Sequence, residues 1–555
     1  MGIKGNRIVE CVPNFSEGRN MDIINAITKE IEETEDVVLL DVDPGADTNR
    51  TVVTFVGSPE GVKEAAFKAI KKASELIDMR NHKGAHPRMG ATDVCPFVPV
   101  SGVNMNDCIE IAKDVGKKVA EQLNIPVYLY EEAATRPERK DLSNVRKGEY
   151  EGLPEKLKDP EWAPDFGKPI FNPRSGASII GAREFLIAYN LNLNTRDKKR
   201  ANKVAFTIRE RGKLNKNAEG NKVRIPGLLK AVKAIGWYIP EYGFAQISVN
   251  LINYKITPLW KLFEVASEEA DKIGLRVTGS ELVGLIPKEA MIQAGRHFLD
   301  KQGKCSGVPE EELIHIAVLS MGMDQIAPFR PEEKIIEYRI AKPRILSGMG
   351  INKFIDDLSS DSPAPGGGSV AALLGSLSSA LSSMVANLTY GKKGYEDAYS
   401  VMNDIAIKLQ EIKDEFLNLM DEDTEAFNKV MDAFRLPRKT EEEKIEREKI
   451  IEEATKGATL IPLETLRLTK EIIPLIEVAA KKGNKNSISD AGVSAISAIG
   501  AAESAYLNII INLKSIKDQS FVAKIKKEAN EHLEYVRKEA EKIKNGVMEK
   551  LKKDL

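Results

Sequence analysis

The hydrophobic pattern of this 555-residue chain changes its period once, near residue 350, and this change constrains the fold more than any other feature. Before it, short apolar runs typical of strands alternate with helical segments. After it, helical periodicity alone fills 369–390, 399–434, 441–457, 461–482, 488–514 and 521–552. The irregular stretch YRIAKPRILSGMG separates the two patterns, so we predict a linker at 339–350 and an all-α helical bundle over 351–555.

The first half repeats one order of elements. Strand and helix patterns follow as β-α-β-β-α-β at 8–12, 21–33, 37–42, 51–56, 60–77 and 92–98. The same order returns at 185–191, 196–211, 234–238, 245–250, 258–273 and 275–278. We therefore predict an α/β (α+β) half of two ferredoxin-like sheet-and-helix subdomains, 1–181 and 182–338, with a ligand cleft at their junction.

Charge and cysteine usage exclude several classes of protein. The 81 basic and 83 acidic side chains leave a net charge near −2, which gives no case for binding nucleic acid or an anionic membrane. The N-terminal stretch lacks an apolar signal segment, and the long uncharged run Ser362–Gly391 is rich in serine and glycine, so we expect a cytoplasmic protein without a membrane span. Four cysteines without a C-x-x-C motif are predicted to be reduced packing residues.

The stretch NHKGAHPRMG, residues 81–90, holds two of the five histidines, His82 and His86, with Lys83 and Arg88 between or after them. Histidine titrates near neutral pH, and a Gly- and Pro-rich loop can aim it at a ligand. A solvated basic loop or a metal-binding histidine pair are the alternatives. Three more stretches combine Gly, Pro or Asn with charges at strand ends, namely VPNFSEGR (12–19), LLDVDPGADTNRT (39–51) and DFGKPIFNPRSGA (165–177). Ordinary turns explain any one of these four stretches, but the four together favour a site.

An aspartate interrupts an apolar stripe in the second half. The stripe runs from Ile405 through Phe416 to Phe434, and its gap is filled by Asp423. A carboxylate on a buried stripe loses hydration, so its pKa should rise unless it is paired, as an acid–base catalyst requires. The alternative is a buried aspartate tied to a lysine or to a helix N-terminus.

The chain resembles the family of glutamate formimidoyltransferases fused to formimidoyltetrahydrofolate cyclodeaminases. In the first half the resemblance lies in ECVPNFSEG (10–18), LLDVD (39–43), TNRTV (48–52), HKGAHPRMGATDVCPFVPV (82–100), PVYLYEEAA (126–134), WAPDFG (162–167) and IGWY (235–238). In the second half it lies in SPAPGGGSVAA (362–372), TYGKK (389–393), DEDTEAFNKVMDAFRLP (421–437) and YLNIIINLKSIKD (506–518).

The resemblance implies two reactions. The first moves a formimidoyl group from N-formimidoyl-L-glutamate to N5 of tetrahydrofolate, and the second cyclises the product to 5,10-methenyltetrahydrofolate with release of ammonia. The transferase histidine of the family falls on His86, and the cyclodeaminase acid–base residue falls on Asp423. An imidazole near neutrality can take the proton of the folate nitrogen and return it to the leaving glutamate nitrogen. Asp43, at a strand end, is our hypothesis for the carboxylate that orients it.

Binding residues follow from the same comparison and from charge. The resemblance places folate binding on Gly167, Lys168, Pro169, Ile170, Phe171, Asn172, Pro173, Arg174, Ser175 and Gly176, with a second contact at Gly227, Leu228 and Leu229. The amides of the PGGGS turn at a helix start predict a further contact at Gly366, Gly367, Gly368 and Ser369. Because the donor is anionic, we expect Arg50, Lys83 and Arg88, with Arg174, to hold carboxylates.

Together these features predict a bifunctional folate enzyme of histidine degradation and one-carbon metabolism. Tetrahydrofolate, expected in polyglutamylated form, is its substrate, and no metal is expected. Its partners are N-formimidoyl-L-glutamate, tetrahydrofolate and further copies of itself, as a homo-oligomeric dimer or a ring of dimers. One alternative is a glutamate formyltransferase with a methenyltetrahydrofolate cyclohydrolase. An alternative of another class is a folate-binding scaffold oligomer with degenerate sites.

Overall fold

The computed structural model describes residues 7–216, 221–341, 344–362 and 364–553. They fall into two compact units, one combining residues up to Gln293 with the stretch that begins at Val318, the other combining Ala294–Ala317 with the helical second half. The first unit mixes sheets and helices and the second is helical, which confirms the predicted fold classes. The boundaries predicted at 181, 338 and 350 stay predictions, and positions 342–343 of the predicted linker lie outside the described residues.

The first sheet contains the predicted split βαβ arrangement. Its strands are β1 (Ile8–Cys11), β2 (Asn14–Phe15), β3 (Val37–Gly45), β4 (Arg50–Gly57), β5 (Thr92–Ser101), β6 (Val127–Glu131) and β7 (Ser178–Ala182). β4 lies between β3 and β1, β1 also pairs with β5, and these pairings are antiparallel. β7 and β6 then extend the sheet as parallel strands beyond β5. The two-residue β2 and the added β7 are absent from the sequence-based assignment.

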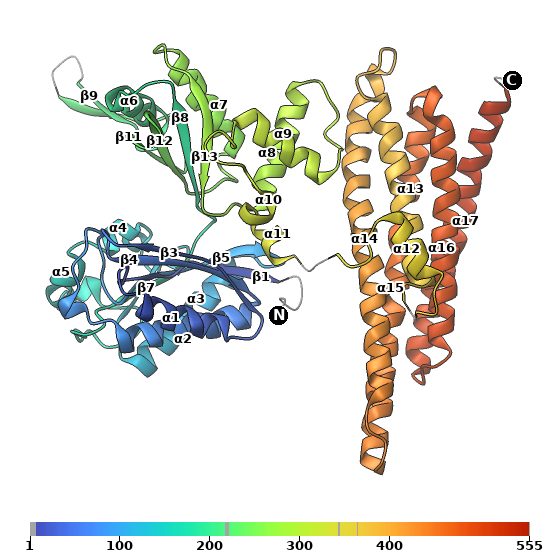
Figure 1. Ribbon diagram of the computed structural model, residues 1–555, viewed down its shortest axis with the longest axis horizontal. Coiled ribbons are helices and arrows are strands. Elements are labelled where there is room, and N and C mark those ends of the chain that lie inside the picture. Colours follow the sequence, from blue (N-terminus) through green and yellow to red (C-terminus); the bar gives the residue numbers. More distant parts are fainter. Residues whose placement is uncertain (1–6, 217–220, 342–343, 363, 554–555) are drawn as a thin grey trace. The chain divides into compact units, whose positions relative to one another are not determined.

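Three helices cover one face of this sheet: α1 (Met21–Glu32), α2 (Pro59–Leu76) and α3 (Met105–Leu123) (Figure 1). Alternate strand residues such as Cys11, Phe55 and Phe97 are fully buried against them, as period-two patterning requires. On the other face, the short α4 (Leu142–Val145) and α5 (Glu149–Lys156) pack over Tyr128 and Tyr130. The short 3₁₀ segments η1 (Met79–Asn81), η2 (Pro137–Arg139) and η3 (Pro160–Trp162) connect these elements.

The second sheet repeats the order in antiparallel form. Its elements are β8 (Ile187–Leu193), α6 (Lys198–Ile208), β11 (Val232–Ile239), β12 (Phe244–Leu251), α7 (Leu259–Asp271) and β13 (Val277–Val283), with strand order β11-β12-β8-β13. A hairpin of β9 (Lys213–Lys216) and β10 (Lys222–Ile225) is inserted after α6. The short helices α8 (Lys288–Lys301), α9 (Glu310–Met321), α10 (Pro331–Lys334) and α11 (Ile336–Ile340) follow. Both sheets therefore have the predicted ferredoxin-like strand order.

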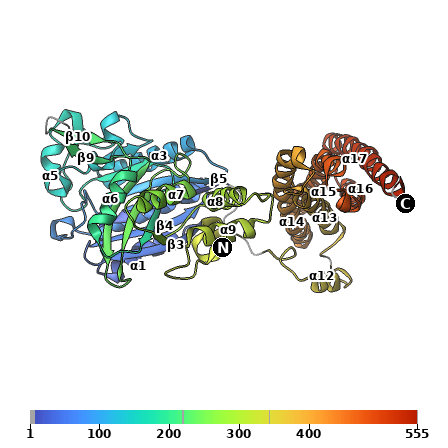
Figure 2. The ribbon, with the colours of Figure 1, turned by 90° about the horizontal axis from the view of Figure 1, so that it is seen from above.

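The second half is a bundle, seen along its helices in Figure 2. Its elements are α12 (Ile351–Leu358), α13 (Gly367–Thr389), η4 (Glu396–Ala398), α14 (Tyr399–Arg435), α15 (Glu441–Lys482), η5 (Lys485–Ser487), α16 (Ile488–Leu513) and α17 (Gln519–Lys553). Small residues bring α13 and α16 close enough for Ser378 and Ser382 to hydrogen-bond to Ser494. By length and composition alone α13 and residues 485–513 could cross a membrane, but 61% of the apolar window of α13 is buried inside the protein.

α15 corrects one sequence-based boundary. Helical periodicity predicted two helices, 441–457 and 461–482. Proline inside a helix cannot donate to the carbonyl four residues earlier. The structure instead has one 42-residue helix with Pro462 and Pro474 inside it. The carbonyl of Ala458, which Pro462 leaves without its helical partner, accepts a hydrogen bond from Nδ2 of Asn512 at 3.2 Å. A neighbouring helix thus supplies the missing donor.

All four cysteines are buried and unbonded, as expected for packing residues. The sulfurs of Cys11 and Cys95 lie 3.5 Å apart on neighbouring strands of the first sheet. Burial raises the pKa of the Cys11 thiol well above its usual value, so it stays protonated and unreactive near neutral pH.

Candidate active sites

Asn49 joins three of the four stretches singled out in the first half. It lies at the turn between β3 and β4 with a left-handed backbone, φ 47°. Its Oδ1 accepts from the amide of Gly18 at 3.0 Å, and its Nδ2 donates to the carbonyl of Lys83 at 3.1 Å. The fourth stretch joins through a bridge between Gly90 and Gly176. The fold therefore brings all four predicted stretches together, although nothing in the sequence distinguished Asn49 as the residue that joins them.

His86 lies half-buried in the loop and contacts Arg50, at the start of β4. Nη1 of Arg50 is 2.8 Å from Nε2 of His86 and 3.1 Å from Oδ1 of Asn14. Because a guanidinium only donates, Nε2 is the acceptor and the imidazole proton is on Nδ1. Asp43 is exposed on β3 and, among the described residues, makes no hydrogen bond to His86. The hypothesis that Asp43 orients His86 is therefore wrong for this geometry, since the contacting group is Arg50.

The electrostatic surroundings of His86 also differ from the prediction of an imidazole near neutrality. Burial, followed by the positive charges of Arg50 and Arg146, lowers the pKa of His86 to about 4. Both effects disfavour the imidazolium. In the protein without substrate His86 is consequently neutral at pH 7, with its basic nitrogen occupied by a guanidinium.

Arg88 is held by contacts within the protein. Its buried guanidinium donates to Glu151 at 2.6 and 2.8 Å, to Glu149 at 3.0 Å, and through Nε to Nδ1 of His82 at 3.2 Å. His82 in turn contacts the carbonyl of Asn49 through Nε2 at 2.9 Å. Four of its five N–H groups are thus bound within the protein, and the predicted substrate role of Arg88 stays a prediction. The two occupied nitrogens of His82 disfavour a metal-binding histidine pair.

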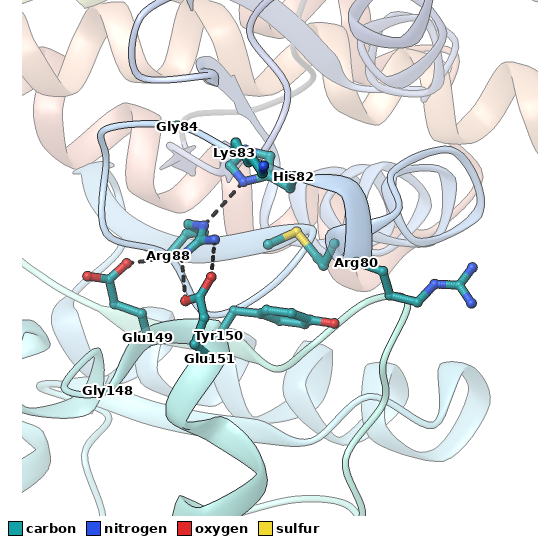
Figure 3. A pocket seen from close by; sticks show the side chains of 10 residues that line it. Arg80, His82, Lys83, Gly84, Arg88, Gly148, Glu149, Tyr150 and Glu151 are labelled. Atoms are coloured by element: carbon teal, nitrogen blue, oxygen red, sulfur yellow. Dashed lines mark hydrogen bonds and ion pairs between the residues drawn. The ribbon is translucent and has the colours of Figure 1, made fainter.

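A cavity of about 670 Å³ opens beside this cluster (Figure 3). It is lined by Met79, Arg80, His82, Lys83, Gly84, Arg88, Gly148, Glu149, Tyr150 and Glu151. The predicted cation Lys83 is exposed at its edge, whereas His86 does not line it. Arg80 is held by a hydrogen-bonded ion pair with Asp78. Among the described residues, Lys83 is therefore the predicted carboxylate binder on this cavity whose ammonium forms no hydrogen bond or ion pair.

The segment Gly167–Gly176 borders the cavity through its neighbours. The ring of Phe171 packs 5.4 Å from that of Tyr150, and the carbonyl of Arg174 accepts from the amide of Met79 at 2.9 Å. Lys168, Pro169, Ile170 and Pro173 are exposed. Asn172 shapes the turn, since its Oδ1 accepts from the amides of Arg174 and Ser175, and Gly167 has a left-handed backbone with φ 90°.

Arg174 itself is not free for a substrate carboxylate. Its Nε donates to the carbonyl of Ser74 at 3.2 Å, Nη2 bonds to the carbonyl of Glu75, and Nη1 lies 3.8 Å from Asp78. These contacts fix the segment on the end of α2. The second predicted folate contact, Gly227–Leu229, lies beside α6, with the amides of Leu228 and Leu229 bonded to Thr207 and Ile208. Leu228 is exposed and Leu229 is buried.

Two charged residues near His86 escaped the sequence-based prediction. Asp93 on β5 is fully buried, accepts from the amide of Met89 at 2.9 Å and forms an ion pair with Arg146. Arg146 follows α4, so neither its sequence position nor its surroundings link it to the histidine loop. An aspartate inside the otherwise apolar strand TDVCPFVPV is the one signal that could have pointed to this pair.

In the second half, Asp423 lies half-buried on α14 against the first turn of α13. Its Oδ2 accepts from the hydroxyl of Ser369 at 3.1 Å, and a Cβ on Gly368 would lie only 2.1 Å from its Oδ1. Gly368 thus lets the carboxylate approach the backbone. The stripe prediction holds up to Leu419, which is buried, but Phe434 at its far end is 49% exposed.

Burial raises the pKa of Asp423, while hydrogen bonds from the hydroxyl and the backbone of Ser369 oppose this shift. The direction predicted from the stripe is confirmed. The alternative of a carboxylate tied to a helix N-terminus describes the same contacts, yet a cap serves best when ionised and has a lowered pKa. A raised pKa is instead suited to a group that must gain and lose a proton.

Three motifs of the second half meet around the PGGGS turn. Gly366 precedes α13 with open space around it, and a Cβ on Gly367 would lie 3.1 Å from Nδ2 of Asn508 on α16. Asp421, on the same helix, accepts from the amide of Leu346 and the hydroxyl of Ser347, each at 2.6 Å. It anchors the connection to the bundle. Among the described residues, no three His, Cys, Asp or Glu side chains cluster in a way that suits a metal ion.

Three family models match consecutive parts of the chain. The formiminotransferase domain, N-terminal subdomain, matches residues 8–183, the formiminotransferase domain matches 188–341, and formiminotransferase-cyclodeaminase matches 350–531. The formimidoyltransferase-cyclodeaminase of Rattus norvegicus is 44% identical over 94% of this chain and 95% of its own length. The glutamate formimidoyltransferase of Streptococcus pyogenes serotype M1 is 43% identical over 53% of this chain and 93% of its own. The methenyltetrahydrofolate cyclohydrolase of Methylorubrum extorquens is 43% identical over 32% of this chain and 86% of its own.

Proposed function

The chain belongs to the formimidoyltransferase-cyclodeaminase family, and on that premise we propose how its two sites divide the work. It is a bifunctional folate-dependent enzyme. The first unit transfers the formimidoyl group of N-formimidoyl-L-glutamate to N5 of tetrahydrofolate. The second closes the ring to 5,10-methenyltetrahydrofolate and releases ammonia. Each candidate site lies within one compact unit, which supports two separate steps.

His86 is the proton carrier of the transfer. N5 of the folate attacks the formimidoyl carbon, the bond from that carbon to the glutamate nitrogen breaks, and one proton passes from N5 to the departing nitrogen. The neutral imidazole, with its proton on Nδ1, accepts this proton at Nε2 and returns it, which contributes about 10²- to 10⁴-fold in rate. The exposed face of Gly167–Gly176 and the adjoining cavity supply room for the folate.

Asp423 is the acid–base group of ring closure. N10 of the folate attacks the formimidoyl carbon and loses a proton, while the departing nitrogen gains protons to leave as ammonia. A carboxyl whose pKa burial has raised can donate and accept in turn. The backbone of Gly366–Ser369, at the start of α13, supports binding of an anionic or carbonyl group of the folate.

The single observation that carries this assignment is the placement of a neutral half-buried imidazole and a desolvated carboxyl in different units. We expect His86→Ala to abolish transfer while ring closure of supplied 5-formimidoyltetrahydrofolate continues, and Asp423→Asn to do the reverse. Glutamate release and ammonia release measure the two steps. Loss of both activities in either folded variant would contradict two independent sites.

The relative named methenyltetrahydrofolate cyclohydrolase favours one alternative function. A formyl-transferring first site with a cyclohydrolase second site would use the same two proton carriers. The one-carbon unit would then stay on the folate, and water would take the place of ammonia in the second step. Supplying N-formimidoyl-L-glutamate or N-formyl-L-glutamate with tetrahydrofolate, and measuring glutamate release and ammonia release, distinguishes these functions. A folate-binding scaffold of degenerate sites would release neither glutamate nor ammonia.

We further propose that the chain assembles with copies of itself. Exposed apolar side chains lie at helical spacing on one face of α13 and of α16, which pack against each other. They are Leu377, Met384, Leu388, Val493, Ile496, Leu507 and Ile511. A patch of this kind on a protein surface usually marks an interface. Sedimentation of the chain and of a double variant, Leu507→Glu with Ile511→Glu, tests this, and a monomeric wild-type chain would contradict it.

The remaining proposals concern the setting of the enzyme. We propose a cytoplasmic enzyme that degrades histidine-derived formimidoylglutamate and prefers polyglutamylated tetrahydrofolate. Tethering two sites raises the local concentration of their shared intermediate, so a long folate tail could stay bound while the pterin moves. Transient kinetics in which the intermediate equilibrates fully with bulk solvent would contradict such transfer.

A further inference from the structure

Two buried guanidinium nitrogens beside His86 lack partners within the described part of the chain. They are Nε of Arg50 and Nε of Arg146. Both are N–H donors without an acceptor, whereas the imidazole N–H of His86 has the backbone of Pro87 as its partner. A buried donor left unsatisfied costs about 1–3 kcal/mol, so such a group calls for an explanation. Cationic donors from two separate elements that both lack an acceptor point to an anionic ligand.

The charges around this point do not balance. Arg50 comes from β4 and Arg146 from the end of α4, and both positive charges act on His86. The fully buried carboxylate facing them is Asp93 of β5, which is already bound to Arg146 and to the amide of Met89. Asp43 acts on Arg50 from the exposed end of β3. Two guanidiniums thus share one buried carboxylate, which leaves a surplus of positive charge beside a neutral imidazole.

We propose that Arg50 blocks Nε2 of His86 until the substrate displaces it. Arg50 and Arg146, the latter held by Asp93, together form one anion subsite. This rests on the proposed transfer reaction. A carboxylate of formimidoylglutamate accepts hydrogen bonds from the unpartnered Nε–H groups and draws Arg50 away from Nε2 of His86. Nε2 of His86 is then free only while formimidoylglutamate is bound. Arg146 is a positioning residue, since it acts on the donor's carboxylate and not on the reacting atoms.

The chemistry of the donor fits this arrangement. Its α-carboxylate is attached to the carbon that carries the leaving nitrogen, so a carboxylate held between Arg50 and Arg146 brings that nitrogen close to His86. Removing one guanidinium and adding a negative charge both favour the imidazolium. Binding of the anion and protonation of His86 therefore strengthen each other, as linkage between two sites requires. In the free enzyme His86 is a weak base whose Nε2 is bound to Arg50. In the complex with formimidoylglutamate it is a stronger base whose Nε2 is free.

The first test uses the full-length chain, L-glutamate as the probe, and the ¹³C NMR signals of its histidines. His86→Gln identifies the signal of His86. We expect the midpoint of its titration, near pH 4 in the free chain, to rise by about one pH unit or more with saturating L-glutamate, and chloride at equal ionic strength to leave it in place. An unchanged midpoint with bound glutamate would overturn the proposal, and this measurement is made on the wild-type chain.

The second test measures transfer kinetics of variants. Arg146→Gln should raise KM for formimidoylglutamate about 10- to 100-fold with a smaller change in kcat, and should weaken the effect of glutamate on His86. Arg146→Lys keeps the ion pair with Asp93 and should fold, yet it loses the planar fork and gives an intermediate KM. Lys147→Gln removes an exposed neighbouring cation and serves as the matched control with unchanged constants.

The two levels of inference fail differently. If the wild-type chain transfers the formimidoyl group but Arg146→Gln and Arg146→Lys keep its KM, the anion subsite is wrong and the transferase assignment stands. If the wild-type chain consumes no formimidoylglutamate in the presence of tetrahydrofolate, the proposed function itself fails. Arg50→Gln distinguishes blocking of His86 from binding of the anion. Removing this guanidinium should raise the midpoint of the His86 titration even without glutamate.

Discussion

Adding one carbon at Gly368 is the sharpest perturbation of the second site. A Cβ there would lie 2.1 Å from Oδ1 of Asp423, whereas ordinary contacts begin near 3.4 Å, so in Gly368→Ala the carboxyl must retreat by the difference of about 1.3 Å. Ser369 holds the other carboxylate oxygen at 3.1 Å, and this bond must lengthen or turn as the carboxyl moves. The substitution thus displaces the acid–base group without changing its chemistry.

A displacement of about 1 Å at a reacting group can cost about 100-fold in rate. We therefore expect ring closure by Gly368→Ala to slow about 100-fold, which corresponds to about 2.7 kcal/mol in activation free energy. Formimidoyl transfer should keep its wild-type rate, since His86 lies in the other unit. Absorbance of the methenyl product and release of ammonia from supplied 5-formimidoyltetrahydrofolate measure the first quantity, and glutamate release measures the second.

Gly457→Ala is the matched control, because this helical glycine of α15 has open space where its Cβ would stand. It should leave both activities unchanged, and thermal melts should show that both variants fold. Ring closure at the wild-type rate in Gly368→Ala would refute the reasoning, since it would mean that the position of Asp423 does not govern the reaction.

Three further substitutions test the first unit, whose unfolding is followed by fluorescence because all three tryptophans lie in the first half. Burial raises the pKa of Glu10 to about 7, so the folded state keeps this proton to a higher pH than the unfolded state. The free energy of unfolding of the wild-type chain should therefore fall by about 3 kcal/mol as pH rises from 4.5 to 7. Glu10→Gln should remove this pH dependence, and an unchanged pH dependence would contradict the assignment. Arg88→Met should lower the unfolding free energy by about 2 kcal/mol in denaturant melts with little effect on substrate KM, whereas a KM effect alone would support its substrate role. Arg139→Met leaves the carboxylate of Asp165 buried and unpaired and should cost about 3–5 kcal/mol in the same melts, a result that an unchanged midpoint would exclude.

Sequence periodicity predicted most of the fold because long amphipathic elements carry their own signal. The helix predicted at 399–434 is α14, Tyr399–Arg435, and the strand predicted at 245–250 is β12, Phe244–Leu251. The sequence-based assignments failed where the structure of a segment depends on a neighbouring strand or helix. β2 is two residues long and is a strand only because β4 and β5 flank it. Pro462 stays inside a helix only because another helix supplies a donor.

The candidate sites were predictable to the level of segments but not of pairings. Local composition marked the four stretches and Asp423, because glycine, proline and charge at strand ends are visible in one dimension. Which cation stays free depends on neighbours distant in sequence. Arg88 and Arg50 look alike in the chain, yet Glu149 and Glu151 occupy the first while His86 receives the second. Arg146 reaches the site from a region that no motif marks.

The turn at Asn49 makes the first site intolerant of sequence drift at one position. The residue there must adopt a left-handed backbone and offer an acceptor to Gly18 and a donor to Lys83. Aspartate lacks the donor, glycine lacks both groups, and glutamine places its amide one methylene too far away. A library randomised over positions 47–49 and selected for transfer should therefore vary at the two exposed or half-exposed positions and return asparagine alone at the third.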